Sequence, residues 1–496
     1  MMKEFSVTGL WRFPGRRKEW AGALSYRPQY GASLELVGRA KDINDLVLSL
    51  RKGNEEGYQE IILGRSPTDS GDELLFTLHR CHIAKAVVCP GCKGSLRLSL
   101  DVNTVIRGKH FSKTQALKFK RLIVDFTHLF AWLNISGITS GINVEVQKPD
   151  LWKELGLDYR DYVAIYKRPQ PINASISDNC TISLYFEKEI GQQLMWDAEE
   201  ESRIKQRVYA MIEFTNKQSL GTFEDVCYHF RNFVSLGVAR PVYPQEIKAR
   251  LEGEYGRPED IEFFIRRPHY SISDTRLPRT EMLFTYADIS ARFESYLSNW
   301  MKNSDRLKPV YDLYFGIIHN PSTYLIHNFL SLVQALETYH RRLEDKNKLT
   351  NDVIDALVQE VLKRPSNRYK KGTLKDRKKP PLIMRILELS KIHENALHPV
   401  IEFWQRVDFA DFVTNARHYY SHLWPEKDST APTKDELWKA NERMKFLLQA
   451  CLLFEVGVSE DQIGDLFSKN GYFGKLVAIL HTLSLQHVIH IPLYRL

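Results

Sequence analysis

The sequence predicts an α+β protein, with a β-rich N-terminal domain carrying helical insertions over residues 1–300 and an all-α helical bundle over residues 301–496. Three observations support this fold class. A chain of 496 residues exceeds what one hydrophobic core usually organises. Apolar residues recur with a period of two from Phe5 to about Thr285. Beyond about Asp288 the period becomes that of an α-helix, so strands should come first and helices afterwards.

The predicted strands alternate apolar and polar side chains, as half-buried antiparallel strands require. SLRLSLDV, residues 95–102, places leucines and a valine at every second position, and TISLYF, residues 181–186, shows the same alternation. Turn-forming stretches such as PQYGAS, SPTDSGDE and CPGCKGS separate the strands. Thr222 to Leu236 is the clearest predicted helical insertion.

The predicted helices of the bundle show apolar residues at helical spacing. The first covers residues 322–342, with Ser322 expected as its N-cap after Pro321. The others are expected at residues 351–362, 382–395, 400–424, 433–456 and 459–467.

Composition excludes several classes of protein. The formal net charge of +8 and pI near 8.9 are compatible with a polyanionic partner. Asp125, His128 and Asn134 interrupt the longest apolar stretch, and the N-terminus lacks the apolar region of a signal peptide, so we expect no membrane association and a cytoplasmic location. There is no Walker loop and no dinucleotide-binding fingerprint.

The segment FVTNARHYYSHLWP, residues 412–425, concentrates groups suited to phosphate chemistry on one helix. A helical wheel predicts a core-facing stripe of Phe412, Ala416, Tyr419 and Leu423. Thr414, Asn415, Arg417, His418, Ser421 and His422 fall on the opposite side. Pro425 should end the helix close to the second histidine.

An arginine and histidines on one exposed face suit attack on a phosphodiester. A guanidinium binds non-bridging oxygens, and an imidazole transfers protons near neutral pH without a metal or cofactor. A merely solvated face remains an alternative interpretation. A metal clamp by His418 and His422 is disfavoured, because no third ligand is near in sequence and the adjacent Arg417 repels a cation.

A basic segment, Lys363 to Pro381, lies between two predicted helices and contains only one acid, Asp376. It is interpreted either as a solvated, mobile connection or as a loop that contacts RNA phosphates. The candidate RNA-binding residues are Lys363, Arg364, Arg368, Lys370, Lys371, Lys375, Arg377, Lys378 and Lys379.

The six cysteines are expected to be reduced. Cys89 and Cys92 form a CPGC turn of the kind that binds structural zinc, with Cys81, His79 or His82 as further candidate ligands. A plain hairpin tip with free thiols is the alternative. Cys180, Cys227 and Cys451 are expected to be packing residues.

Arg417 and His422 have the spacing of the RxxxxH motif, and ARHYYSH, residues 416–422, resembles the catalytic motif of ApeA-type HEPN domains. Residues 329–342, FLSLVQALETYHRR, resemble the helix that opens such a domain. Residues 9–40, beginning GLWRFPG, are similar to the start of the ApeA N-terminal domain. The resemblance therefore reaches both ends of the chain, in the expected order.

The resemblance implies a bacterial antiviral abortive-infection ribonuclease that cleaves host RNA, with tRNA the favoured substrate, and acts as a homodimer or higher oligomer. Arg417 and His422 match the invariant motif pair, and His418 occupies a polar position that is commonly Asn or Asp. Trp424 stands where some HEPN toxins carry a regulatory tyrosine. Glu337, Asn415 and Ser421 are expected to support the site.

The leading hypothesis is a metal-independent endoribonuclease. Its β-rich domain would act as a sensor that releases the helical domain when a phage-derived activator protein binds. Two alternatives remain: a catalytically inactive HEPN module that dimerises or docks another protein, and an RNA-binding regulator without chemistry.

Overall fold

The computed structural model describes residues 4–53, 58–68, 71–88, 95–142, 162–190, 204–252, 258–267, 277–343, 349–364, 369–401, 406–422 and 431–488. The chain forms two compact units. Unit 1 comprises Met1–Phe130, Ile135–Tyr228 and Tyr243–Thr275, and unit 2 comprises Ala131–Asn134, His229–Val242 and Arg276–Leu496. The predicted fold class, a β-rich region followed by a helical region, is confirmed.

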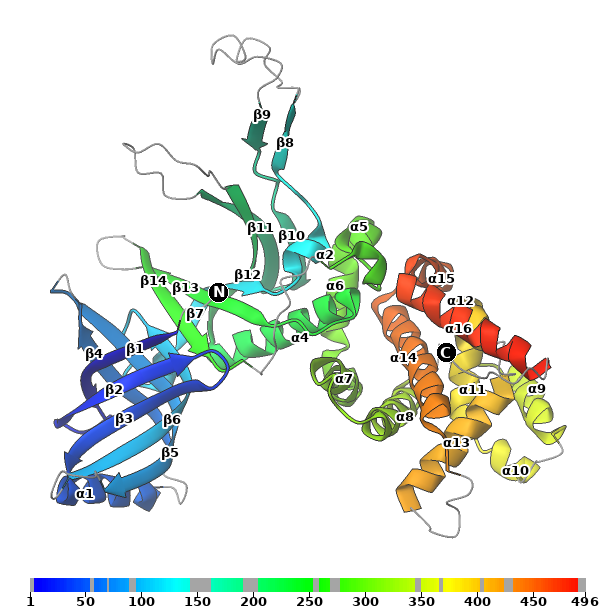
Figure 1. Ribbon diagram of the computed structural model, residues 1–496, viewed down its shortest axis with the longest axis horizontal. Helices are drawn as coiled ribbons and strands as arrows, with labels where there is room; N and C mark the ends of the chain where they lie inside the picture. The colour runs from blue at the N-terminus through cyan, green and yellow to red at the C-terminus, as the bar shows by residue number, and fades with distance from the viewer. Residues whose placement is uncertain are drawn as a thin grey trace, which may run out of the picture. The chain divides into compact units, whose positions relative to one another are not determined.

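Six antiparallel strands of unit 1 close into a barrel (Figure 1). Neighbouring strands follow the order β6-β3-β2-β1-β4-β5, and β5 also pairs with β6. Their interior is filled by large apolar side chains, among them Trp11, Leu34 and Leu98, as expected for a small barrel. The strands are β1 (Phe5–Arg12), β2 (Glu19–Arg27), β3 (Gly31–Arg39), β4 (Gln59–Pro67), β5 (Glu73–Val88) and β6 (Ser95–Arg107).

The tryptophan of the GLWRFPG segment, Trp11, has a structural role in the barrel. Its ring is fully buried, and its Nε1 donates a hydrogen bond to the Gly22 carbonyl at 3.1 Å. Gly64 lies opposite Trp11 on β4, where a Cβ atom would come within 2.1 Å of the tryptophan ring. Only glycine leaves room for the indole at this position.

The sheet continues from β6 through strands that lie outside the barrel, in the order β14-β13-β7-β12-β11-β10. The alternation predicted for residues 181–186 is confirmed, because Ile182, Leu184 and Phe186 are buried. These strands are β7 (Lys118–Phe126), β10 (Ile172–Ser177), β11 (Cys180–Ile190), β12 (Ile204–Ser219), β13 (Pro244–Glu252) and β14 (Pro258–Ile265), while β8 (Ile138–Ile142) pairs separately with β9 (Tyr162–Tyr166).

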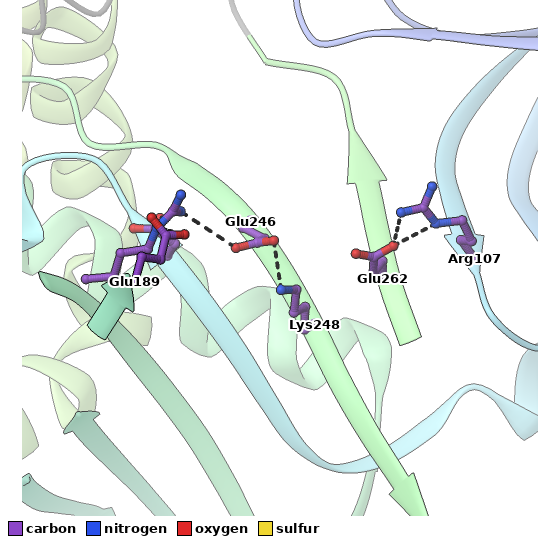
Figure 2. Close-up of polar contacts among 7 residues, drawn as sticks. Arg107, Glu189, Glu246, Lys248 and Glu262 are labelled. Atoms are coloured by element: carbon purple, nitrogen blue, oxygen red, sulfur yellow. Dashed lines mark hydrogen bonds and ion pairs between the residues drawn. The ribbon is translucent and has the colours of Figure 1, made fainter. Parts of the chain in front are cut away.

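Charged side chains occupy the other face of this sheet (Figure 2). The Arg207 guanidinium lies 2.7 Å from Glu189, 3.4 Å from Asp125 and 4.0 Å from Glu246. Lys248 pairs with Glu246 at 2.8 Å. Each of these two cations therefore lies next to at least one carboxylate.

The helices of unit 2 pack around α14, which is buried along most of its length. Thr433 and Glu436 form the capping box that starts α14, as the sequence predicts for a helix beginning near residue 433. These helices are α5 (Tyr286–Ile289), α6 (Phe293–Lys302), α7 (Ser304–His319), α8 (Leu325–Arg342), α9 (Asn351–Leu362), α10 (Lys371–Leu374), α11 (Leu382–Ile392), α12 (Glu394–Ile401), α13 (Arg406–His422), α14 (Lys434–Val456), α15 (Glu460–Lys469) and α16 (Gly471–Val488).

The remaining helical segments are short or lie early in the chain. They are α1 (Ala40–Gly53), which packs on β3 and β6, α2 (Leu129–Leu133), α4 (Leu220–Val238), and the 3₁₀ turns at Thr114–Ala116, Arg279–Glu281 and Ser290–Arg292. The predicted insertion at Thr222 to Leu236 corresponds to α4. None of the described helices combines the length and the apolar character that a bilayer crossing requires.

Three predicted helix boundaries were wrong. The helix expected over residues 382–395 ends at Ile392 in α11, and α12 begins at Glu394. Ser322 is not an N-cap, because the Thr323 hydroxyl donates to the Asn320 carbonyl in a turn and α8 begins only at Leu325. The helix expected over residues 400–424 is divided between α12, which ends at Ile401, and α13, which begins at Arg406. Trp424 and Pro425 lie outside the described residues.

Candidate active site on helix α13

Helix α13 is held in the bundle by a stripe that differs from the predicted one. Phe409, Val413 and Ala416 are buried, and α13 packs against α11 and α8. Of the predicted stripe only Ala416 is buried, whereas Phe412 and Tyr419 are half-buried and Leu423 lies outside the described residues. The stripe is rotated because Tyr420 contacts the buried Phe329 of α8, with ring centroids 6.1 Å apart.

The motif residues lie on the last turns of α13. Arg417, His418 and Ser421 are exposed, as predicted. Arg417 forms no hydrogen bond or ion pair with any other residue that the structure describes. His422 is the last residue of the helix, and its side chain lies outside the described part.

The backbone favours positive charge at this position. The carbonyl end of a helix carries a partial negative charge, which stabilises a guanidinium or a protonated imidazole in the last turn. Burial raises the pKa of Tyr420, with a smaller contribution from Tyr419, so its phenol stays neutral.

Asn415 and Glu337 have partners within the bundle. The Asn415 side-chain amide donates to Asp411, one turn earlier on α13, at 3.0 Å. Glu337 on α8 pairs with Arg341 at 2.7 Å and with Arg385 at 3.4 Å. Their roles in supporting the motif stay predictions.

A buried charged network that the sequence reasoning missed joins α8, α11 and the basic segment. His340 and Glu388 are both buried and lie 3.1 Å apart. Arg377 approaches the same carboxylate at 3.7 Å, and Arg385 Nε donates to the Pro380 carbonyl at 2.8 Å. The signal was a charged pair, Arg385 and Glu388, inside the otherwise apolar LIMRILEL stretch.

The basic segment divides into paired and exposed cations. Arg364 forms an ion pair with Asp408, and Lys375 pairs with Asp355 at 2.8 Å. Together with Arg377 they contribute to the structure of the bundle. The exposed lysines, for which the described residues provide no acidic partner, are Lys363, Lys370, Lys371, Lys378 and Lys379. Arg368 lies outside the described residues.

The described part of this segment has a defined structure. Lys371–Leu374 form α10, whose Leu374 is buried. One Asp376 carboxylate oxygen accepts hydrogen bonds from the backbone N–H groups of Lys378 and Lys379, at 2.9 and 3.0 Å. Two exposed lysines are thus held next to a fixed turn.

The predicted zinc site is described only in part. Cys81 is fully buried in the apolar core of the barrel, and burial raises the pKa of its thiol. Its neighbour His82 is exposed on the same strand, whereas His79 is buried. Cys89 and Cys92 lie outside the described residues. No group of three or more metal-binding side chains occurs within the described ranges, and zinc binding by the CPGC turn stays a prediction.

Two family models match the chain. The model for ApeA N-terminal domain 1 matches residues 6–300, which is more than half of the chain. The model for the Apea-like HEPN domain matches residues 330–462 and includes most of α8, the basic segment and α13. Searches of curated proteins and of solved structures returned no match.

Proposed function

The chain belongs to the ApeA-like HEPN family, and on this premise we propose that it is a metal-independent endoribonuclease active in abortive infection. Membership of the family indicates a HEPN nuclease with a role in defence. The observation that carries the proposal for this chain is the exposed Arg417 on α13, which the described residues leave without an ionic partner.

The proposed reaction uses the motif side chains directly. Arg417 binds the non-bridging oxygens of the scissile phosphate and stabilises the charge that develops on them. The ribose 2′-oxygen attacks phosphorus and loses its proton to one imidazole, while the bond to the 5′-oxygen breaks and that oxygen takes up a proton. His422 acts as base or acid with support from His418, and the products are a 2′,3′-cyclic phosphate and a 5′-hydroxyl.

The exposed lysines of the basic segment would hold the RNA, with tRNA as the favoured substrate. These lysines are suited to contact phosphates, because no carboxylate of the described bundle forms an ion pair with them. HEPN domains commonly dimerise and bind RNA, so we propose that two copies of α13 face a shared cleft.

Unit 1 is proposed as the sensor, and its ligand as a phage-derived activator. This assignment rests on the order of the two matched domains, since an N-terminal ApeA domain precedes the HEPN domain. The resting protein would then be inactive until the activator binds.

Incubation of the purified protein with total RNA in EDTA tests the proposal. Cleavage that His422→Ala abolishes supports a metal-independent nuclease, whereas loss of cleavage in EDTA would contradict metal independence. Co-expression with individual phage genes provides the trigger that an autoinhibited enzyme requires, and toxicity should then depend on His422. RNA that is bound but stays intact under these conditions would favour the RNA-binding regulator.

A further inference from the structure

Residues 376–380, between α10 and α11, form a turn that presents two lysines to solvent. The Asp376 carboxylate accepts hydrogen bonds from the backbone N–H groups of Lys378 and Lys379, at 2.9 and 3.0 Å. Both lysine side chains are exposed. Because these hydrogen bonds set the direction of the backbone, the two side chains leave the protein from a defined point. We call residues 376–380 the lysine turn.

Two buried charged side chains of α11 hold the lysine turn at both ends. The Arg377 guanidinium lies 3.7 Å from the carboxylate of Glu388, whose side chain is only 7% exposed. Arg385, with a side chain that is 9% exposed, donates from Nε to the Pro380 carbonyl at 2.8 Å. The two exposed lysines lie between these attachments in the sequence.

The burial of Glu388 explains why Arg377 stays attached. A carboxylate removed from water is costly unless positive charge or hydrogen-bond donors lie beside it. His340 Nε2 lies 3.1 Å from this carboxylate, and Arg377 adds a permanent positive charge. Movement of the lysine turn away from α11 would separate Glu388 from Arg377, so the energy of the buried carboxylate opposes that movement.

An ordered turn favours binding of a polyanion, because a loop that already has its bound shape loses less conformational entropy when the ligand binds. The hydrogen bonds to Asp376, the ion pair of Arg377 and the hydrogen bond from Arg385 are three restraints of this kind. Helix α11, which supplies two of them, also packs against the motif helix α13. The lysine turn and the motif are therefore attached to the same helix.

We propose that Glu388 is a positioning residue for RNA binding. Through Arg377 it holds the lysine turn, so that Lys378 and Lys379 contact phosphates of the substrate from a fixed position. Glu388 acts without touching the RNA, since its side chain is buried. This inference rests on the proposed function, in which the exposed lysines of the basic segment hold the RNA.

The affinity of Glu388→Gln for a single-stranded oligonucleotide, measured across a salt series, tests the inference. Methylation of every 2′-oxygen of this probe blocks transesterification, so only binding is measured. Removing a negative charge should by itself strengthen binding to a polyanion. Loss of positioning predicts the opposite sign. We expect binding to weaken by up to about 10-fold at physiological salt, and the salt slope to fall by up to about 1.4, the share of two phosphate contacts with a single strand.

Two controls accompany Glu388→Gln. Glu455 on α14 is a similarly buried carboxylate, 6% exposed, that pairs with Arg306 on α7, outside the basic segment. Glu455→Gln should therefore leave the salt slope unchanged. In a protein that already carries Lys378→Gln and Lys379→Gln, Glu388→Gln should have no further effect on the slope, because the contacts that it positions are absent.

Arg377→Gln tests the same attachment from the other side. The Arg377 side chain is 39% exposed, so the fold should tolerate its replacement even if it does not tolerate Glu388→Gln. The salt slope should fall by more than about 0.7, the share of one contact, because the two lysines lose their position together with the lost arginine. A fall of about 0.7 or less would limit Arg377 to a contact of its own and would contradict the proposal.

Two results for Glu388→Gln would overturn the inference. An unchanged or stronger affinity with an unchanged salt slope would show that the buried carboxylate does not position the lysines. A further fall of the slope in the protein that lacks both lysines would show that Glu388 acts on other contacts. A failure of the proposed function appears differently: removal of the lysines themselves would leave RNA binding and its salt slope unchanged, and the inference would fall with it.

Discussion

The charged face of the sheet in unit 1 and the end of helix α13 in unit 2 use the same kinds of residue for opposite purposes. On the sheet, arginines are matched by carboxylates on neighbouring strands: Arg107 with Glu262, Arg121 with Glu213, Arg207 with Glu189 and Arg250 with Asp260. On α13, Arg417 has no such match among the described residues. The partner, and not the residue type, therefore distinguishes a structural cation from a binding one.

Burial accounts for the difference. The side chains of Arg207 and Asp125 are only 19% and 13% exposed, so each would be costly without the other. Arg417 is in water and carries no such penalty. Its charge is available to a ligand without any loss of folding stability.

The largest expected effect is that of Arg417→Ala on RNA cleavage. Removing a preorganised donor to a developing oxyanion typically costs about 10²- to 10³-fold in rate. Arg417→Lys should recover only part of this loss, since lysine keeps the charge but not the two-pronged geometry. Cleavage is measured on activated protein, and the free energy of unfolding should be unchanged.

A loss of stability in Arg417→Ala equal to the loss of activity would contradict this prediction, because it would make Arg417 a structural residue like Arg207. The Thr414→Ala variant is a matched control on the same helix. The Thr414 hydroxyl donates to the Ala410 carbonyl at 2.8 Å, one turn earlier, so RNA cleavage should be unchanged there.

Unlike Arg417→Ala, Arg207→Ala should lower stability, and the free energy of unfolding of unit 1 should fall by about 2–3 kcal/mol. The change leaves the desolvated Asp125 carboxylate without its closest cation. Arg121→Ala is the control, because Arg121 and Glu213 form a more exposed pair at 2.6 Å, worth less than about 1 kcal/mol. Denaturant unfolding of both variants measures the difference, and equal losses would refute the role assigned to burial.

Much of the fold follows from periodicity. The alternation of Leu96, Leu98 and Leu100 predicted a strand with one buried face, and β6 has it. The closure of the barrel could not be predicted, since it requires β1 to pair with β4 and β3 with β6, and these strands are not neighbours in sequence. Gly64 opposite Trp11 is one such contact.

The exposure of the motif was predictable, and its environment was not. A wheel placed Arg417 and His418 away from the core, and both are exposed. The wheel stripe was wrong because Tyr420 packs on Phe329, a contact between helices that are far apart in sequence. The His340 and Glu388 pair could not be predicted for the same reason, since it forms between α8 and α11, which are far apart in sequence.

The basic segment contains both cations that pair with carboxylates and lysines for which the described residues provide no acidic partner. We expect a smaller effect from changing these lysines than from changing Arg417. Neutralising Lys370, Lys371, Lys378 and Lys379 together should weaken RNA binding about 10- to 100-fold at physiological salt. It should also reduce the salt slope, by about 0.7 per lost contact with a single strand. Binding is measured across a salt series, and an unchanged slope would remove these lysines from the RNA site.

The control for the lysines uses the paired cations of the same segment. Lys375→Gln removes a cation that already binds Asp355. It should change the salt slope less than the loss of any exposed lysine. A larger change would mean that the ion pairs of this segment do not keep their cations from RNA.

The smallest expected effect concerns Asp125, whose pKa is raised to about 6, mainly by burial and despite the nearby Arg207. The unfolded chain should titrate near 3.9, so folding takes up a proton between about pH 4 and pH 6. The stabilisation from this proton is complete below pH 4 and is lost as pH rises through 6.

The unfolding free energy of wild-type unit 1 should therefore decrease by about 1–2 kcal/mol over this pH range, and the Asp125→Asn variant should lack this decrease. Glu246 also raises the pKa of Asp125, whereas Arg207 and Arg267 lower this pKa and stay charged throughout the pH range. Unfolding free energies measured from pH 4 to pH 7 give the difference. If the unfolding free energy of wild type and of Asp125→Asn changes with pH in the same way, Arg207 compensates fully for the burial of Asp125. Burial of charge would then not distinguish the sheet from α13.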